Sequence, residues 1–350
     1  MRTIVLTGGG TAGHVLPHFA LLPYLEKHFT RIVYIGRTQG TERDLVQKKN
    51  IEYHGITSAK LRRSFDLRNL SVPFKLLKGI NEAKRLLREI RPDAVFSKGG
   101  FVAYPVVRAA AKLGIPVIAH ESDMTMGLAN RLSAKYCKSI CTTFARTAKN
   151  GGKFIHTGSP IRANIYKGNK AAVQLLFPSL RAARNLLVVG GSQGAKNINT
   201  AVVAALPELT EKYNIIHLCG QGKKGEGGNS TPLNYVQLEY ADNIADFYAW
   251  ADVVVSRAGS NALCELVALK KPTLFIPLSR AASRGDQIEN AEFTARQAAA
   301  SVLSEDDLTP KNLVAAINET YANRETYAQN AAKLNLDGTQ EIAEVIIKNC

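Results

Sequence analysis

Cysteine is scarce in this sequence, and no two cysteines stand in a pairing pattern. The number is odd and no CxxC pair occurs among Cys137, Cys141, Cys219, Cys264 and Cys350. This pattern excludes a disulfide scaffold and a CxxC-type zinc site, and it favours a reducing cytoplasm.

Long apolar runs are also missing. No uninterrupted stretch reaches the roughly 18 residues that a membrane-spanning helix needs. Residues 1–7 lead directly into a glycine turn and lack the charged, apolar and cleavage regions of a signal peptide. We therefore expect no signal peptide. Hydrophobic residues are 45% and charged residues 21% of the chain, which argues against disorder. At roughly 100–200 residues per domain, 350 residues predict two domains.

Acidic residues are few in the first half of the chain. Residues 1–160 hold 26 basic and 10 acidic residues, whereas residues 161–350 hold 19 of each, so the whole net charge of +16 lies in the first half. Segment 60–91 alone has ten basic residues against three acidic ones. This asymmetry indicates an anionic partner, which could be nucleic acid, an anionic membrane or a phosphorylated substrate. A solubilising surface is the alternative.

The two halves repeat one plan. Residues 2–7 predict a strand that ends in a glycine turn, followed by helical spacing over 14–27 and a second strand, 31–36, which together form a βαβ unit. The string DAVFSKGG at 93–100 resembles DVVVSRAG at 252–259. We therefore predict two doubly wound parallel-sheet domains that join near residues 157–163. Further predicted strands cover 93–97, 116–120, 185–189, 215–219, 252–256 and 273–277, with helices at about 104–113, at 196–205 and from Ser260 to Leu269.

The first glycine loop, GGGTAG at 8–13, suits an anion. Its spacing also fits the dinucleotide fingerprint, but Gly36-Arg37 occupy the place of the ribose-binding acid. The helix expected to start near residues 11–14 would point N–H groups at a phosphate. His14 stands at this start, where the helix dipole should keep it neutral, as a general base requires. The alternative is a histidine that merely caps the turn.

The second glycine loop, GGSQGA at 190–195, adds the side-chain donors of Ser192 and Gln193, which suits a pyrophosphate; a tight packing turn is the alternative. Ser260 is expected as the N-cap of the next helix, with Glu265 placed to accept the hydroxyls of a ribose. Asp286, Gln287 and Asn290 could bind sugar hydroxyls, with an ordinary polar helix start as the alternative. Arg162 could bind a phosphate or nucleobase from the hinge, and a surface arginine is the alternative. Residues 222–231 are expected to form a mobile loop.

Six motifs in this order resemble the MurG family of glycosyltransferases: GGGTAGHVLP at 8–17, GGFVAYPVV at 99–107, HESDMTMGLAN at 120–130, GSPIR at 158–162, LLVVGGSQGAKNIN at 186–199 and YAWADVVVSRAGSNALCE at 248–265. The resemblance covers nearly the whole chain. It implies the GT-B architecture, in which two Rossmann-like domains face each other across a cleft. Residues 1–160 would form the acceptor and membrane-facing domain, and 161–335 the UDP-GlcNAc-binding domain. A C-terminal helix at about 336–350 would pack back on the first domain.

The resemblance also implies the activity. The family transfers N-acetylglucosamine from UDP-GlcNAc to lipid I in peptidoglycan synthesis, on which cell shape and division depend. No cofactor and no metal are expected, because a DxD motif is absent and helix termini with Arg or Lys must offset the charge of the leaving UDP. Rival interpretations are a GT-B enzyme that acts on diacylglycerol, a basic nucleic-acid-binding protein and an NAD-dependent oxidoreductase. No nucleic-acid partner is expected, since no recognisable module is present.

Site residues follow from the resemblance by motif. His14 would be the general base, and Glu121 a catalytic or supporting carboxylate on the acceptor side. Asp123, on the same side, stands where relatives have Asn. Ala12 replaces a family glycine, which is tolerable unless its φ is positive. The expected UDP-GlcNAc-binding set is Thr11, Ala12, Gly13, Arg162, Ser192, Gln193, Gly194, Ala241, Ile244, Ser260, Asn261, Glu265 and Gln287.

The charge asymmetry gains a reason from this resemblance. Lipid I carries a pyrophosphate and lies in the cytoplasmic leaflet, so the basic first half is expected to bind this anionic surface as a peripheral protein. Within 70–80, apolar residues alternate with Lys75 and Lys78, as in an element pressed into a membrane interface. Packing on the domain core is the equally weighted alternative.

Overall fold

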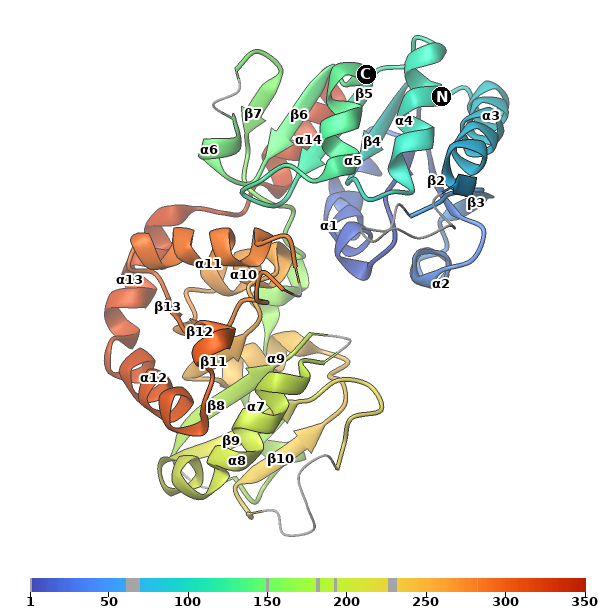
Figure 1. The fold of residues 1–350 in the computed structure, drawn as a ribbon. Coiled ribbons are helices and arrows are strands. Elements are labelled where there is room, and N and C mark those ends of the chain that lie inside the picture. The colour runs from blue at the N-terminus through green and yellow to red at the C-terminus, as the bar shows by residue number, and fades with distance from the viewer. Residues whose placement is uncertain are drawn as a thin grey trace. The chain divides into compact units, whose positions relative to one another are not determined.

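Short β-branched runs alternate with helices along the chain, and the strands assemble into two separate parallel sheets (Figure 1). The computed structural model describes residues 2–60, 70–148, 151–180, 183–191, 194–225, 232–281 and 283–350. One compact unit consists of Met1–Arg162 with Asp337–Cys350, and the other of Ala163–Leu336. From the sequence we predict the boundary between residues 160 and 161, and a C-terminal helix from about residue 336 that packs on the first domain.

The sheet of the first unit has seven strands in the order β3-β2-β1-β4-β5-β6-β7. The inner strands are buried along their whole length, as a parallel sheet covered on both faces requires. Their bounds are β1 Thr3–Thr7, β2 Arg31–Arg37, β3 Glu52–Ile56, β4 Ala94–Ser97, β5 Val117–Glu121, β6 Ser139–Thr142 and β7 Phe154–His156.

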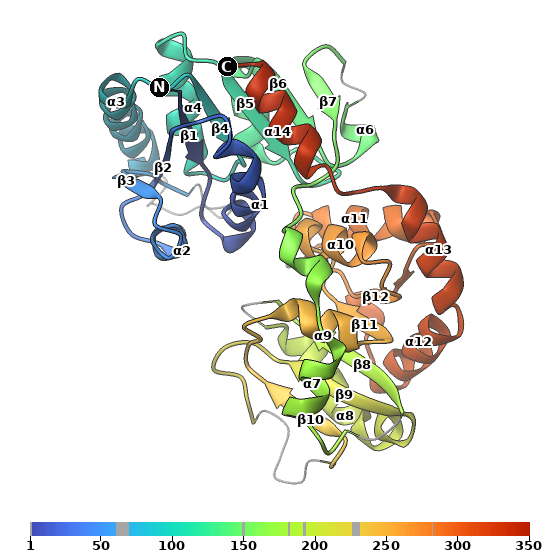
Figure 2. The same ribbon diagram turned by 180° about the vertical axis from the view of Figure 1, so that it is seen from behind.

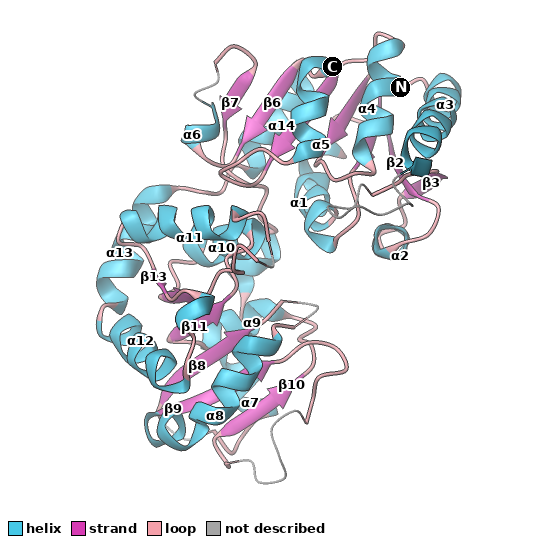
Figure 3. Ribbon diagram, viewed as in Figure 1, coloured by secondary structure: helices cyan, strands magenta, loops and turns pink. Residues whose placement is uncertain are grey.

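Helices cover both faces of this sheet, as Figure 3 shows by colour. On one face, α3 (Val72–Ile90) and α4 (Ala103–Lys112) pack on alternate strand residues such as Val33 and Val95. On the other, α1 (Leu16–Leu25), α2 (Thr41–Gln47) and the C-terminal helix α14 (Thr339–Lys348) pack on Tyr34 and Phe96. The remaining elements are η1 Ala12–His14, α5 Leu128–Ser133, η3 Ala134–Tyr136 and α6 Ala145–Ala148.

The last helix, α14 (Thr339–Lys348), belongs to the first unit although it ends the chain (Figure 2). Its apolar side chains Ile342 and Ile346 are fully buried against α1 and β6. Gly338 precedes it, and a side chain there is excluded, because a Cβ would lie 1.8 Å from the oxygen of Thr157. The chain terminus therefore completes one layer of the first unit's core.

The second unit has a six-stranded sheet in the order β10-β9-β8-β11-β12-β13, whose bounds are β8 Arg184–Val189, β9 Tyr213–Leu218, β10 Tyr235–Leu238, β11 Val253–Ser256, β12 Thr273–Phe275 and β13 Ser301–Val302. Helices α8 (Lys196–Lys212) and α12 (Pro310–Ala322) bury one face. Other elements are η4 Ala163–Lys167, α7 Lys170–Leu176, α9 Ile244–Trp250, α10 Ser260–Ala268, α11 Asp286–Arg296, η5 Glu305–Asp307 and α13 Arg324–Leu334.

The predicted fold class is confirmed, because both sheets are doubly wound and parallel. The matching strings at 93–100 and 252–259 hold β4 and β11, which pair with β1 and β8, the first strands of their sheets. One local prediction is wrong. The first long helix starts at Leu16 and not near residues 11–14, since Ala12–His14 forms a separate 3-10 turn.

Candidate functional site

The order of the strands reverses at one place in each sheet, and a glycine loop leaves the sheet there. In the first unit this place lies between β1 and β4, and in the second between β8 and β11. In open α/β sheets, ligands bind outside the carboxyl ends of the strands at such a point. The loops at 8–13 and 190–195, which follow β1 and β8, therefore stand where each sheet is built to bind a ligand.

In the first unit, the 8–13 loop is packed against the loop that follows β4. A Cβ at Gly100 would lie 2.2 Å from the oxygen of Gly9, and one at Gly10 would lie 2.5 Å from the ring of Phe101. Both glycines also have positive φ, +80° and +89°. These positions need glycine because two backbone loops approach each other directly at the reversal.

His14 ends the 3-10 turn beside this loop, partly exposed. Its Nδ1 lies 3.0 Å from the hydroxyl of Thr11, so the ring is held by a neighbour in its own turn. Its backbone N–H donates to the oxygen of Thr11 at 3.1 Å. This N–H group therefore does not point at a phosphate, as a helix start near residues 11–14 would have required. Ala12 is helical, not in the positive-φ region, so its methyl group is tolerated, and Gly13 is exposed.

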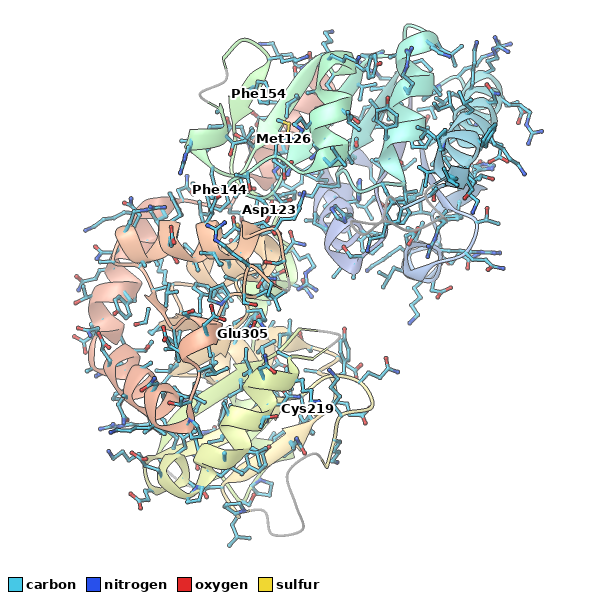
Figure 4. All side chains as sticks on the ribbon, in the orientation of Figure 1. Asp123, Met126, Phe144, Phe154, Cys219 and Glu305 are labelled. Carbon is cyan, nitrogen blue, oxygen red and sulfur yellow. The ribbon has the colours of Figure 1, made fainter. Side chains whose placement is uncertain are left out.

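Glu121 is buried at the end of β5 and holds the loop that follows (Figure 4 labels Asp123 in this loop). Its carboxylate accepts hydrogen bonds from the N–H groups of Asp123 and Gly127, at 3.1 and 3.0 Å, and from the amide of Asn130 at 2.9 Å. Burial raises the pKa of Glu121, and the nearby charge of Asp123 raises it further. Glu121 therefore holds the backbone of this loop from within.

A second buried polar group at this edge joins β4 to β5. Lys98, directly after β4, donates from Nζ to Nδ1 of His120 at 2.7 Å and to the hydroxyl of Ser122 at 2.5 Å. His120 in turn lies 2.9 Å from the oxygen of Gly158 through Nε2. Burial, and then Lys98, hold the pKa of His120 well below its ordinary value, so the ring is neutral.

In the second unit, Ser192 and Gln193 lie outside the described residues, as do residues 226–231 of the expected mobile loop. The described part of the 190–195 loop requires glycine at Gly194, where φ is +66° and a Cβ would lie 2.1 Å from the oxygen of Cys219. The loop thus lies against the end of β9, and α8 begins directly after it.

The prediction that Ser260 caps α10 is wrong. Gly259 is the N-cap, because its backbone is extended and its carbonyl accepts the helical bond from Leu263 at 3.0 Å. Ser260 is instead the first helical residue, followed by Asn261, and both are partly exposed. Glu265 lies in the same helix and is partly exposed, as a ribose ligand has to be.

Next to α10, an ion pair joins three segments that follow strands. Arg257 donates from one nitrogen to the carbonyl oxygens of Ile276 and Pro277, at 3.1 and 3.3 Å, and pairs with Glu305 through another. Glu305 also accepts from the N–H of Ser279 at 3.0 Å. The amide oxygen of Gln287 accepts from the N–H of Leu278 at 3.1 Å, which leaves its NH₂ group for a ligand.

The remaining expected residues lie at separate places. Ala241 is buried before α9, and Ile244 is the first residue of that helix. Asn290 is fully buried in α11, and its amide lies 3.4 Å from the oxygen of Ala258. Arg162 is the last residue of its segment in the first unit. The reasoning from sequence overlooked Lys98, Ser122 and Glu305; the basic residue that follows the strand in both repeated strings was the available signal for Lys98.

Two further properties concern only the residues that the structure describes. None of their helices is long and apolar enough to cross a membrane. Within the same part of the chain, no three His, Cys, Asp or Glu side chains form a group suited to a metal ion.

Two doubly wound units, each with a glycine loop at its strand-order reversal, match the GT-B architecture of known glycosyltransferase structures. The fold is similar to that of CalG4, the calicheamicin glycosyltransferase, with a TM-score of 0.72, 15% identity, and coverage of 99% of this chain and 97% of that one. The chain belongs to the MurG family. The models of the glycosyltransferase family 28 N-terminal and C-terminal domains match residues 4–142 and 185–346.

Individual relatives extend over nearly the whole chain. A protein of Lachnospira eligens is 50% identical over 95% of both chains, and one of Clostridium botulinum is 47% identical over 99% of both. Both are named UDP-N-acetylglucosamine–N-acetylmuramyl-(pentapeptide) pyrophosphoryl-undecaprenol N-acetylglucosamine transferase. The crystal structure of Acinetobacter baumannii MurG is similar with a TM-score of 0.78 and 28% identity, covering 99% of this chain and 100% of that one.

Proposed function

We propose that this chain transfers N-acetylglucosamine from UDP-GlcNAc to lipid I, the undecaprenyl-pyrophosphoryl N-acetylmuramyl-pentapeptide, and so forms lipid II for peptidoglycan synthesis. The observation that carries the proposal is the 47–50% identity, over nearly the full chain, to relatives named for this reaction. The glycine loops at both strand-order reversals support it, because they provide one ligand-binding edge in each unit.

The second unit would bind UDP-GlcNAc. Gly194, with Ser192 and Gln193, would hold the pyrophosphate at the start of α8, and Glu265 would accept the ribose hydroxyls. Gln287 would donate its NH₂ group to the sugar, a role that the bond from Leu278 to its oxygen supports. Ala241 and Ile244 would contact the uracil of UDP-GlcNAc. Ser260 and Asn261, at the start of α10, would contact the same substrate. The first unit would contribute Thr11, Ala12, Gly13 and Arg162.

In the reaction, His14 would take the proton from the muramyl 4-hydroxyl. The oxygen would attack the anomeric carbon of GlcNAc as the bond to UDP breaks, so the configuration inverts and a β-1,4 link forms. The contact between Thr11 and Nδ1 of His14 supports this role, because a base must be oriented toward its proton. Arg162 and the starts of α8 and α10 would offset the charge on UDP without a metal.

We further propose that the first unit binds the anionic cytoplasmic face of the membrane as a peripheral protein. Apolar residues at and just before the start of α3 differ in burial: Ile80 is buried in the core, whereas Leu70, Phe74 and Leu77 are 72, 75 and 60% exposed. Lys75 and Lys78 flank them. Exposed apolar side chains among lysines are typical of a surface that enters the headgroup region, where each base contributes about 1 kcal/mol.

The decisive experiment is transfer of radiolabelled GlcNAc from UDP-GlcNAc to a short-chain lipid I analogue in the presence of EDTA. Transfer with formation of a β-1,4 link is expected. Diacylglycerol is the control acceptor: transfer to it, and none to lipid I, contradicts the proposed acceptor. Absence of transfer to both, with no release of UDP, contradicts the proposed activity itself.

A further inference from the structure

One buried lysine touches three segments around the strand-order reversal of the first unit. Lys98 is 1% exposed and follows β4 directly. Its Nζ reaches the end of β5 at His120 and the next loop at Ser122. Its stem lies against the glycine loop, since a Cβ at Gly8 would stand 3.3 Å from the Cβ of Lys98.

The hydrogen bonds from Lys98 run in one direction. An ammonium group only donates, so Nδ1 of His120 is an acceptor and the ring proton resides on Nε2. That proton is donated to the oxygen of Gly158, 2.9 Å away, in the segment that leads to Arg162. Lys98 therefore fixes the tautomer of His120. Through that ring it also holds the carbonyl group of Gly158, which lies 60 residues further along the chain.

The loop at 122–127 lies between two sets of anchors. Lys98 holds Ser122 at one end, while the carboxylate of Glu121 holds the backbone of Asp123 and Gly127. The hydroxyl of Thr147 donates to the oxygen of Met124 at 2.9 Å. Three of these bonds reach backbone atoms of the loop, whereas the bond from Lys98 reaches the side chain of Ser122. Lys98 follows β4 and lies against the glycine loop, so this bond ties the two loops together.

The second unit repeats this device. Arg257 occupies the position in DVVVSRAG that Lys98 occupies in DAVFSKGG, and it too ties its strand to the segment after the next strand. In the first unit the link joins β4 to β5, and in the second it joins β11 to β12. A cation at the same place in two sheets indicates that the link shapes the carboxyl edge, where ligands bind.

We propose that Lys98 is a positioning residue for the acceptor sugar. It would act by holding Ser122 and the 122–127 loop, which contains Asp123, the residue expected on the acceptor side, in the conformation that receives the muramyl residue. Lys98 does not touch the reacting atoms, because it is buried beneath the loops. The inference deepens the proposed function and rests on transfer to lipid I.

The test compares Lys98→Met with Lys112→Met, its matched control. Methionine keeps the length of the side chain but donates no hydrogen bond, and Lys112 is exposed at the end of α4 in the same unit. Kinetics are measured with a soluble lipid I analogue and UDP-GlcNAc varied in turn. We expect Lys98→Met to raise the KM for the acceptor about tenfold, in line with the loss of a charged hydrogen bond, and to leave the KM for UDP-GlcNAc unchanged. Lys112→Met should change neither.

A second variant, Ser122→Ala, keeps the test decisive should Lys98→Met fail to fold. It should raise the acceptor KM by itself, and the double variant should be no worse than Lys98→Met, because both remove the same link. Unchanged acceptor KM in these variants, equal rises for both substrates, or additive effects overturn the proposal. Wild-type transfer with unaffected variants counts against Lys98 alone, whereas no wild-type transfer to lipid I counts against the proposed function.

Discussion

Arg257 and Glu305 form an ion pair whose side chains are only 12 and 6% exposed, at the carboxyl edge of the second sheet (Figure 4 labels Glu305). Glu305 also accepts hydrogen bonds from the N–H of Ser279 and from the amide of Asn197, at 3.0 and 3.1 Å. Burial alone would raise the pKa of Glu305, but the bond from Ser279 and the contact with Arg257 bring it below the ordinary value. The pair thus fixes segments that follow β8, β11 and β12.

Glu305→Gln should therefore affect both stability and donor binding. The substitution keeps the shape but leaves the guanidinium of Arg257 without its counter-charge, and we expect the free energy of unfolding to fall by about 2 kcal/mol. The KM for UDP-GlcNAc should rise, while the acceptor KM stays constant. Denaturant unfolding and steady-state kinetics measure both. Glu325→Gln is the control, since Glu325 pairs with Arg324 but is 80% exposed; equal effects of the two substitutions contradict the prediction.

His14→Ala should lower kcat about 10²- to 10⁴-fold, the usual contribution of a positioned base, with little change in the affinity for UDP-GlcNAc. Thr11→Val should cause a smaller loss, because the ring keeps its base but loses the contact at Nδ1. His28→Ala, at an exposed site after α1, is the control and should retain full activity. Turnover by His14→Ala within a factor of two of wild type removes His14 from the base role.

The fold followed from local signals where the sequence is most regular. The β-branched run before the first glycine loop predicted β1, the apolar run before the second predicted β8, and the repeated strings located β4 and β11. Edge strands gave no comparable signal: β3 has the sequence EYHGI and is largely half-exposed, and β13 has only two residues. A strand is recognised from sequence when both of its faces are buried, and an edge strand lacks that pattern.

The candidate site divides in the same way. His14 in its turn and Glu265 inside α10 stand in local motifs and could be found by reading along the chain. Lys98 and Ser122 are 24 residues apart and meet only because β4 and β5 are neighbours in the sheet. The cap of α10 was missed for a subtler reason: glycine and serine are both accepted at an N-cap, and the backbone decides between Gly259 and Ser260.

Asp123→Asn should stabilise the protein at neutral pH. Burial and then Asp123 raise the pKa of Glu121. A carboxyl with a raised pKa in the folded state contributes stability at low pH and loses it as the pH rises through that value, so ionised Glu121 costs stability at pH 7. Removing the neighbouring charge should recover about 0.5–1 kcal/mol at pH 7 and nothing at pH values where Asp123 is protonated. Urea unfolding across this range, with the exposed Asp242→Asn as control, measures the difference.

Buried neutral histidines should make the protein sensitive to mild acid. Burial lowers the pKa of His18 to about 3 and that of His217 to about 4. Below pH 6.5 the unfolded chain takes up protons that the folded chain refuses, so the free energy of unfolding falls by up to about 1.4 kcal/mol per pH unit for each histidine. His217→Gln removes this penalty. The loss of unfolding free energy that the substitution causes should therefore be about 2 kcal/mol smaller at pH 5 than at pH 7. An exposed control, His28→Gln, should show the same difference at both pH values.

The exposed start of α3 predicts a membrane-binding variant with a matched control in the other unit. Phe74 and Leu77 are 75 and 60% exposed beside Lys75 and Lys78, whereas Leu175 and Leu176 are 83 and 65% exposed in α7. If α3 enters the interface, replacing Phe74 and Leu77 by serine should weaken binding to anionic liposomes at least about tenfold, because the apolar area buried in lipid is lost. Replacing Leu175 and Leu176 by serine should not weaken binding. Sedimentation with phosphatidylglycerol vesicles at two salt concentrations separates the apolar part from the charge attraction. Equal losses in the two double variants contradict a membrane contact at the start of α3, since the loss would then follow the removal of any exposed apolar pair.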